Sequence, residues 1–378
     1  MNQYDAVIVG GGIAGSVAGR YFAKANLNTL IVESAFTPRE KPCSAIQFKY
    51  FERIIGKKIP KKKLCKNSLN SVCMEYPNGN SIKLPFPMLN FTRDVFDDWL
   101  NQIAIEDGAK FRDGVRCDDF KRINDGFLVT LHPKHGDIEK VKTKYLIAAD
   151  GLCSCLRKKI RPQDYTESNP GVTLNYYFKN YNEGDLDSNT LYQFWNINYS
   201  NLMFAWAYKK NDLWVIGTGH TDNVEKRCDK LVDHIRDKFN FNGEIKRKEG
   251  YISKFCLYDP DHVYLGHKDL FFIGDAAGLI DLYRGLGMDA AALSGRYLAK
   301  AIKKGEDKSK NPLKYYKKYM KKTIKKIKKN SKKQIISLGS NEELRYYLKK
   351  RSLKSLLNTF FGTIYNKIFP ITKLVLLP

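Results

Sequence analysis

One stretch near the N-terminus limits the possible fold more than any other part of the chain. The sequence YDAVIVGGGIAGSVAGRYFAKANLNTLIVES predicts a strand over residues 4–9, a helix over 16–25 and a second strand over 27–32. A G-x-G-x-x-G turn of Gly10, Gly12 and Gly15 joins the first strand to the helix. Glycines let the backbone approach a diphosphate closely, and the free N–H groups of a helix N-terminus attract it. Strand, turn, helix and strand together predict a dinucleotide-binding unit.

Glu33 ends the second predicted strand. A carboxylate at this position accepts hydrogen bonds from ribose hydroxyls. No arginine stands beside Glu33 in the sequence to favour a 2′-phosphate.

Two later stretches indicate which dinucleotide is bound. KYLIAADGLCSCLR, residues 144–157, predicts a strand that ends at Asp150-Gly151, and residues 269–302 predict one that ends at Gly274-Asp275, ahead of a helix. Such an aspartate suits a ribityl hydroxyl, and the backbone N–H groups of residues 285–288 suit a flavin ring edge or its phosphate. Each Gly-Asp pair alone could be an ordinary turn. Their order after the first motif favours FAD over NAD.

These motifs resemble the FAD-binding fold of aromatic hydroxylases, flavin halogenases and geranylgeranyl reductases, over roughly residues 4–305. Within that group, KPCSAIQ (41–47), NFTRDVFDDWLNQIAIEDGAKF (90–111) and FAWAY (204–208) resemble the geranylgeranyl reductases. The sequence departs from that family at Ser44-Ala45, where paired glycines are common, and at Lys209 and Leu282, which replace prolines. A halogenase Trp-x-Trp-x-Ile-Pro motif would align with residues 204–209, where only Trp206 matches.

The resemblance implies an α/β fold in three parts. Residues 1–160 and 262–305 form a discontinuous Rossmann-type FAD-binding domain. Residues 161–261, with parts of 60–92, form an inserted antiparallel β-sheet domain for the substrate. Residues 306–378 form a basic C-terminal helical region.

The motifs and the family resemblance together indicate the site residues. We expect the cofactor to contact Gly10, Gly12, Ala14, Gly15, Glu33, Ser44, Ala45, Arg93, Val115, Asp150, Gly151, Gly274, Asp275, Gly285, Gly287 and Met288. We expect the substrate to contact Phe204, Trp206 and Tyr208, and we take Cys43 as the catalytic candidate.

Two of these roles stay open at this point. The resemblance places Cys43 near the flavin, where a thiol could shape the pocket, donate a proton to a substrate carbon or become oxidised, but cysteine is also a common small buried contact. Arg93 contacts the FAD phosphate or positions the isoalloxazine by resemblance, because its planar fork suits phosphate. Its plainer role is a surface salt bridge with Asp94 or Asp97.

Within residues 160–260, aromatic residues stand at alternating positions along several predicted strands. With their inward faces over the flavin, Tyr176, Phe178, Phe194, Phe204, Trp206 and Tyr208 would form an apolar lining. Aromatic residues also fill ordinary sheet cores. An isoprenoid substrate would need such a lining, since each buried CH₂ contributes about 0.8 kcal/mol.

The basic charge is concentrated in the tail. Residues 300–378 hold 23 Lys and Arg against 4 Asp and Glu, out of a net charge of +25. Residues 311–340 predict a basic amphipathic helix, and residues 352–378 are apolar but interrupted. We expect the tail to lie on an anionic membrane surface; the alternative is a helix that packs its apolar face on the body. No nucleic-acid-binding module accompanies the charge, so we expect no nucleic-acid partner.

The cysteine and histidine patterns exclude other classes of site. The eight cysteines form no C-x-x-C pair and the six histidines show no ligand spacing, so we expect reduced thiols and no metal. The chain opens directly on a strand, which predicts no signal peptide. We expect a cytoplasmic protein, peripheral on the cytoplasmic face of the membrane.

The leading hypothesis is an FAD-dependent reductase that saturates C=C bonds of an isoprenoid lipid or prenyl side chain. The alternative is an FAD-dependent monooxygenase that hydroxylates or epoxidises an apolar substrate, and a non-enzymatic flavoprotein scaffold is a third reading. No second G-x-G-x-x-G appears, so the electron donor would be NAD(P)H visiting the flavin, or reduced ferredoxin. The sequence leaves the oligomeric state open.

Overall fold

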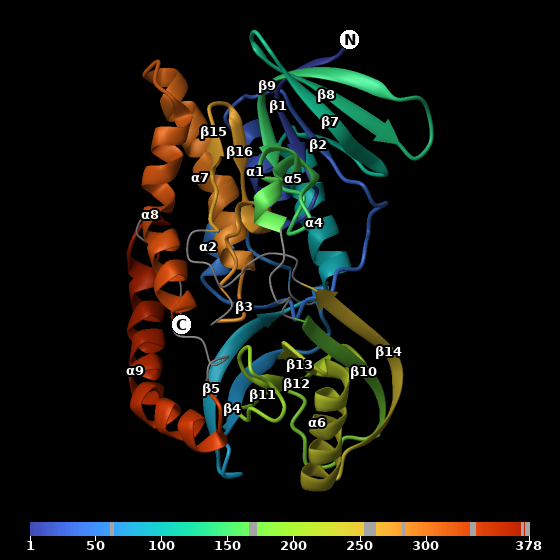
Figure 1. Cartoon of the computed structure of the whole chain (residues 1–378), viewed down its shortest axis with the longest axis vertical. Coiled ribbons are helices and arrows are strands. Elements are labelled where there is room, and N and C mark those ends of the chain that lie inside the picture. The colour runs from blue at the N-terminus through green and yellow to red at the C-terminus, as the bar shows by residue number, and fades with distance from the viewer. Residues whose placement is uncertain are drawn as a thin grey trace.

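A computed structural model describes residues 1–60, 64–165, 172–252, 262–281, 284–332, 338–371 and 374. Cys256 and Leu282 lie outside these residues. The described chain forms two eight-stranded sheets, one in each half of the molecule (Figure 1). A pair of long C-terminal helices runs along one side of both halves (Figure 1).

The first sheet contains the N-terminal motif. Its central strands run in the order β15-β16-β9-β1-β2-β6, with β8 paired to both β7 and β9. Strands β16, β9, β1, β2 and β6 pair in parallel. Strands β1, β2 and β16 and the last four residues of β9 are mostly apolar and buried, as expected for a sheet covered on both faces. The strands are β1 (Gln3–Val9), β2 (Thr29–Val32), β6 (Lys110–Arg112), β7 (Val115–Ile123), β8 (Gly126–Pro133), β9 (Glu139–Ala148), β15 (Gly266–His267) and β16 (Leu270–Phe272).

Helices from distant parts of the sequence pack together beside this sheet. Helix α1 contacts both α4 and α7, and α2 and the C-terminal helix α8 (Pro312–Ser331) contact α7. Small residues allow the close approach of α1 and α7: a Cβ on Gly295 would stand 2.5 Å from the carbonyl oxygen of Ala14. The helices are α1 (Ile13–Ala23), α2 (Phe51–Ile55), α4 (Arg93–Glu106), α5 (Cys155–Ile160) and α7 (Met288–Asp307).

The second sheet joins the inserted segment to an earlier part of the chain. Its order is β14-β10-β13-β12-β11-β4-β5-β3. The strands of the inserted segment pair antiparallel with one another, as expected. The sheet is extended by β4 of the earlier segment, with which β11 pairs in parallel. The strands are β3 (Ile46–Phe48), β4 (Leu69–Glu75), β5 (Ser81–Asn90), β10 (Val172–Asn182), β11 (Thr190–Phe194), β12 (Ala205–Lys210), β13 (Leu213–His220) and β14 (Asn242–Ile252).

The two faces of the second sheet have different neighbours. Helix α6 (Val224–Phe239) covers one face, where its Leu231 and Ile235 pack in a cluster with Tyr176, Phe178 and Phe194. We expected these three aromatic residues to face the flavin, and that expectation is wrong. Side chains alternate between the faces of a strand, so they point to α6 and leave the opposite face to other residues.

The C-terminal region consists of α8 (Pro312–Ser331) and α9 (Asn341–Ile368). As predicted, α8 begins at Pro312 and is amphipathic. Its apolar residues Leu313, Tyr316, Met320 and Ile327 are buried in the main hydrophobic core, however. The expectation that this face meets a membrane is therefore wrong for α8, because the body of the protein covers it. No helix within the described residues is long and apolar enough to cross a bilayer.

Candidate functional site

One cavity, of about 470 Å³, lies between the two sheets. Its lining at one end comes from the glycine-rich loop and the turns that follow the first sheet, and at the other from β4, β5, β11, β12 and α9. Of the predicted site residues, Gly12, Ala14, Cys43, Ser44, Arg93, Gly151, Phe204, Trp206, Tyr208, Asp275, Gly285, Gly287 and Met288 line it. The predicted residues that are not among its lining residues are Gly10, Gly15, Glu33, Ala45, Val115, Asp150 and Gly274.

The glycine-rich turn has the geometry of an anion site. Gly10 has φ +112°, and a Cβ there would stand 2.3 Å from the carbonyl oxygen of Ala149. A Cβ on Gly15 would stand 1.9 Å from the carbonyl oxygen of Gly10, so only glycine lets α1 sit against the turn. Gly12 borders the cavity at the N-terminus of α1, beside the guanidinium of Arg39. Helix N–H groups and an arginine suit a diphosphate.

Glu33 has a different environment from the one that we expected. Its Oε2 accepts the N–H of Gly11 at 2.9 Å and lies 3.2 Å from Nε of Arg39, and its Oε1 accepts the N–H of Ala35 at 3.0 Å. No arginine adjoins Glu33 in the sequence, but the fold places Arg39 beside it. Arg39 is six residues further on, and the intervening loop folds back to bring it to the carboxylate.

The two aspartates that follow the first-sheet strands differ. Oδ2 of Asp150 accepts the backbone N–H of Cys155 at 2.9 Å at the start of α5, while its buried Oδ1 has no partner among the described residues. Burial raises the pKa of Asp150. Asp275 borders the cavity, with Oδ2 3.8 Å from Nζ of Lys41. Asp275 is thus the aspartate that a bound molecule in the cavity can reach.

The cavity retains open space beside two glycines. A Cβ on Gly151, at φ +76°, would meet no other atom within 4 Å, and one on Gly287 would come only to ordinary contact distance of Asp275 and Ile280. Glycine at these positions leaves a cradle that any side chain would fill. With the glycine-rich turn and Asp275, this cradle fits an extended dinucleotide such as FAD, and Gly12, Arg39, Asp275 and Gly287 are the residues that would hold it.

A buried ion-pair network supports the loop before α7. The Arg284 guanidinium is bonded to Asp281 through Nε at 2.8 Å and to Asp289 through Nη1 at 2.9 Å. The Tyr50 hydroxyl donates to Asp289 at 2.5 Å, and Asn330 on α8 donates to Asp281 at 2.7 Å. The network fixes residues 284–288 against both α7 and the C-terminal region.

Cys43 lies where the two halves of the cavity meet. Its Sγ accepts the N–H of Ala45 at 3.4 Å and lies 3.9 Å from Sδ of Met288. Ala45 has φ +47°, a left-handed conformation that favours glycine, and it is fully buried. This turn aims the partly exposed thiol of Cys43 into the cavity.

Arg93 is a cavity residue and not part of a surface salt bridge. Its Nε and Nη2 donate to the two carboxylate oxygens of Asp97, at 2.8 and 2.7 Å, and only 6% of Arg93 is exposed. Burial lowers the pKa of Arg93, but the Asp97 carboxylate more than offsets this and raises it overall. The pair is therefore charged, and Arg93 brings a fixed positive charge to the cavity beside Cys43.

Sequence reasoning missed Lys210, the last residue of β12. Its Nζ donates to the backbone carbonyls of Ser44 and, at 2.7 Å, of Phe91, so it joins the second sheet to the Cys43 turn. Burial lowers the pKa of Lys210 to about 8. The alternation of β12 could have placed Lys210 on the buried face with Tyr208, although lysine at a sheet's end is usually exposed.

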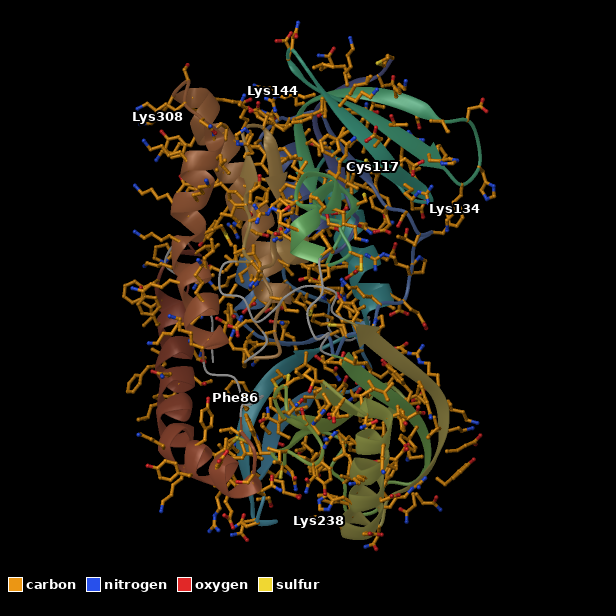
Figure 2. The ribbon with its side chains drawn as sticks, in the orientation of Figure 1. Phe86, Cys117, Lys134, Lys144, Lys238 and Lys308 are labelled. Atoms are coloured by element: carbon orange, nitrogen blue, oxygen red, sulfur yellow. The ribbon has the colours of Figure 1, made fainter. Side chains whose placement is uncertain are left out.

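The other end of the cavity is apolar. Phe204, Trp206 and Tyr208, which we expect to contact the substrate, line this end, and Nε1 of Trp206 donates to Asn175 at 2.8 Å. Figure 2 shows Phe86, another lining residue, on the second-sheet strand β5. Tyr347, Leu348 and Thr359 of α9 close this end. The remaining lining side chains here include Phe48, Val72, Met74, Leu84, Met88, Leu191 and Trp195.

The other described cysteines lie away from the cavity. The seven cysteines that the structure describes carry free thiols, and only Cys43 lines the cavity. Burial raises the pKa of Cys117 to about 12, in the other half of the molecule from Phe86 (Figure 2). The described residues contain no cluster of three potential metal ligands.

Comparison with known proteins identifies similar sequences. No family model matches the chain. Digeranylgeranylglycerophospholipid reductase 1 of Methanosphaera stadtmanae is 27% identical over 84% of this chain and 80% of its own. Geranylgeranyl diphosphate reductase of Rhodobacter capsulatus is 27% identical over 79% of this chain and 75% of its own.

Solved structures give the same fold. A geranylgeranyl bacteriochlorophyll reductase-like protein of Thermoplasma acidophilum superposes with a TM-score of 0.77 at 19% identity, over 100% of this chain and 94% of the other. The halogenase PltM in complex with phloroglucinol and FAD gives a TM-score of 0.74 at 16% identity, over 96% of this chain and 82% of the other. The chain thus has the fold of the FAD-dependent oxidoreductases and, among them, resembles the geranylgeranyl reductases.

Proposed function

We propose that this protein is an FAD-dependent reductase that saturates C=C bonds of an isoprenoid lipid or prenyl side chain. The observation that carries the proposal is one continuous cavity, in which a dinucleotide cradle leads into an apolar chamber with Cys43 at their junction. The reductase names of the related sequences support the same reaction class. A long hydrocarbon gains affinity from such a chamber in proportion to the apolar surface that it buries.

The residues at the dinucleotide end and at the apolar end of the cavity have different roles. Bound FAD, once reduced, supplies the hydride equivalent for an alkene. Phe204, Trp206 and Phe86 hold the prenyl chain and exclude water from the chamber. Saturation also needs a proton on the second alkene carbon, and the Cys43 thiol is the cavity group placed to donate it.

Arg93 and Lys210 set the electrostatic environment and the orientation of Cys43. Arg93 places a positive charge beside the thiol, which stabilises the thiolate that remains after proton donation. Lys210 holds the carbonyl of Ser44 and so fixes the direction in which Cys43 points. Neither residue needs to meet the substrate to have these effects.

We also propose that α9 seats the protein on an anionic membrane. Leu357, Phe360, Phe361, Ile364 and Ile368 are 40–70% exposed and recur at helical spacing, so they form one apolar stripe along α9. Exposed Lys349, Lys350 and Lys367 lie on the same helix, and α8 presents further exposed lysines. An apolar stripe with lysines around it suits the interface of an anionic bilayer.

This stripe supports the assignment of a lipid substrate. Thr359 lines the cavity while its neighbours Phe360 and Phe361 face outward. The same turn of α9 therefore separates the apolar chamber from the surface where a lipid would arrive.

The test is an anaerobic half-reaction. The FAD-loaded protein is reduced with dithionite, mixed with a geranylgeranyl-tailed glycerophospholipid, and followed by flavin absorbance and lipid mass. We expect the oxidised flavin band to return while the lipid gains hydrogen in pairs. A fully saturated phytanyl lipid is the control and should leave the flavin reduced.

Two other results would contradict the reductase. If flavin and lipid change only after oxygen is admitted, and the product gains one oxygen atom, the protein is a monooxygenase. If neither condition yields product while FAD binds tightly, an isoprenoid lipid is not the substrate.

A further inference from the structure

Gln47 is a buried amide that the fold leaves without a partner. The residue is 2% exposed, and neither Oε1 nor Nε2 has a hydrogen-bond partner among the described residues. It nevertheless lines the cavity. An unpaired buried amide costs roughly 1–3 kcal/mol, so folded chains seldom keep one. A ligand bound in the cavity would supply the hydrogen bonds that this amide lacks.

Strand register shows which end of the cavity Gln47 serves. Gln47 pairs with Leu89 across the antiparallel β3–β5 ladder, so the two side chains share a face. Leu89 belongs to the hydrophobic core of the first sheet, whereas Ile46, on the other face of β3, belongs to a cluster of the second sheet. Gln47 therefore points to the dinucleotide half, two residues after the Cys43–Ala45 turn.

The chemistry of the amide selects its ligand. A prenyl chain carries neither donors nor acceptors, so it could not satisfy Gln47. The pyrimidine edge of an isoalloxazine presents an N–H between two carbonyls, and a primary amide offers an acceptor and a donor side by side. We propose that the Gln47 side chain binds this edge of the flavin, with Oε1 accepting from N3–H and Nε2 donating to an adjacent carbonyl oxygen.

The proposal rests on the proposed cofactor, and it has a signature that a structural role would not produce. Gln47→Leu removes an unsatisfied polar group from the FAD-free protein, so the apoprotein should melt at a higher temperature. The same change removes two hydrogen bonds to the flavin, so FAD should bind roughly tenfold or more weakly. Opposite shifts in apoprotein stability and FAD affinity identify a ligand-binding group; a packing residue would lower both.

The experiment measures apoprotein melting and FAD affinity, by quenching of flavin fluorescence, for the full-length wild type and two variants. Gln193→Leu is the matched control, since Gln193 lines the same cavity from β11. FAD methylated at N3 is the second probe. We expect the wild type to bind this analogue roughly tenfold or more weakly than FAD, Gln47→Leu to bind both alike, and Gln193→Leu to behave as wild type.

The outcomes separate the two proposals. A wild type that fails to bind FAD overturns the proposed function itself. Tight FAD binding by both wild type and Gln47→Leu overturns the role of Gln47 alone. Equal loss of FAD affinity in Gln47→Leu and Gln193→Leu, or a lower melting temperature in the Gln47→Leu apoprotein, would assign Gln47 to packing.

Discussion

At the scale of single residues, the junction of the cavity combines a thiol with two buried cations. Arg93 forms an ion pair with Asp97 through two hydrogen bonds, so it stays protonated whatever binds nearby. Lys210 has only backbone carbonyls as hydrogen-bond partners among the described residues, so its charge is not neutralised by a carboxylate. The Cys43 turn between them therefore depends on one paired and one unpaired cation, which have different sensitivities to pH.

Cys43→Ser should separate proton donation from shape. Serine keeps the size of the side chain and can still accept from the N–H of Ala45, but its hydroxyl is a far weaker acid than a thiol. We expect flavin reoxidation by the lipid to slow by about 100-fold or more in both Cys43→Ser and Cys43→Ala, with FAD affinity unchanged. Single-turnover stopped-flow absorbance measures this rate. Near wild-type rates in both variants would leave Cys43 a lining residue only.

Lys210→Met should change how stability depends on pH. Burial lowers the folded-state pKa of Lys210 to about 8, whereas the unfolded value is near 10.5. Between these values the unfolded chain binds the proton and the folded chain does not, so the wild type gains stability as pH rises. Relative to Lys210→Met, we expect a wild-type gain of roughly 3 kcal/mol from pH 7.5 to 10.5. Urea unfolding at several pH values measures it.

Lys210→Arg is the control, because arginine stays charged throughout this pH range. Its unfolding free energy, compared with that of Lys210→Met, should show no such rise with pH. A wild-type profile parallel to that of Lys210→Met would show that Lys210 keeps its ordinary pKa.

At the scale of elements, alternation decided which aromatic residues reach the cavity. Phe204, Trp206 and Tyr208, predicted to contact the substrate, all line the cavity. Tyr176 and Phe178 were grouped with them because aromatic residues alternate along the predicted strands, but α6 covers their face of the sheet. The sequence shows that neighbouring residues of a strand face opposite ways; which face meets the cavity depends on where α6 packs, and that is a tertiary contact.

The C-terminal helices are a second case in which the sequence predicted an element but not what the element packs against. The pattern of α8 predicted an amphipathic helix correctly, but could not tell a membrane from the rest of the protein as the partner of its apolar face. Burial of Tyr316 and Met320 answers that question for α8. Exposure of Phe360 and Phe361 moves the membrane proposal to α9.

The α9 stripe should carry membrane binding. In a Phe360→Ser, Phe361→Ser double variant, two aromatic side chains that would enter the bilayer interface are removed. We expect at least tenfold weaker binding to vesicles with 30% phosphatidylglycerol, since each phenyl group buried in lipid contributes roughly 1.5–3 kcal/mol. Vesicle sedimentation measures the bound fraction.

Ile138→Ser is the matched control, because Ile138 is 59% exposed but lies between β8 and β9, away from α9 (Figure 1). It should bind vesicles as the wild type does. Equal binding by all three proteins would remove α9 as the membrane contact.

At the scale of the whole molecule, the sequence predicted the parts better than their contacts. The glycine-rich motif indicated the first sheet and its ligand end, because its glycines are required by backbone geometry at Gly10 and Gly15. Contacts between segments that are far apart in the chain produce no local sequence pattern, so they could not be predicted. Arg39 beside Glu33, Lys210 beneath Ser44 and α9 at the end of the chamber all depend on how separate elements pack.

The closure of the chamber by α9 should limit substrate length. Thr359 lines the end of the cavity that is formed by α9, and a larger side chain there shortens the space for the prenyl chain. We expect Thr359→Phe to raise KM for a geranylgeranyl substrate by tenfold or more, since excluding even two CH₂ groups from the chamber costs about 1.6 kcal/mol. Turnover of a geranyl substrate, which is half as long, should stay near the wild-type value, and Thr359→Ser should treat both as the wild type does. If Thr359→Phe affects both substrates equally, the prenyl chain does not extend as far as α9. The chain would then contact only the part of the chamber that Phe204 lines.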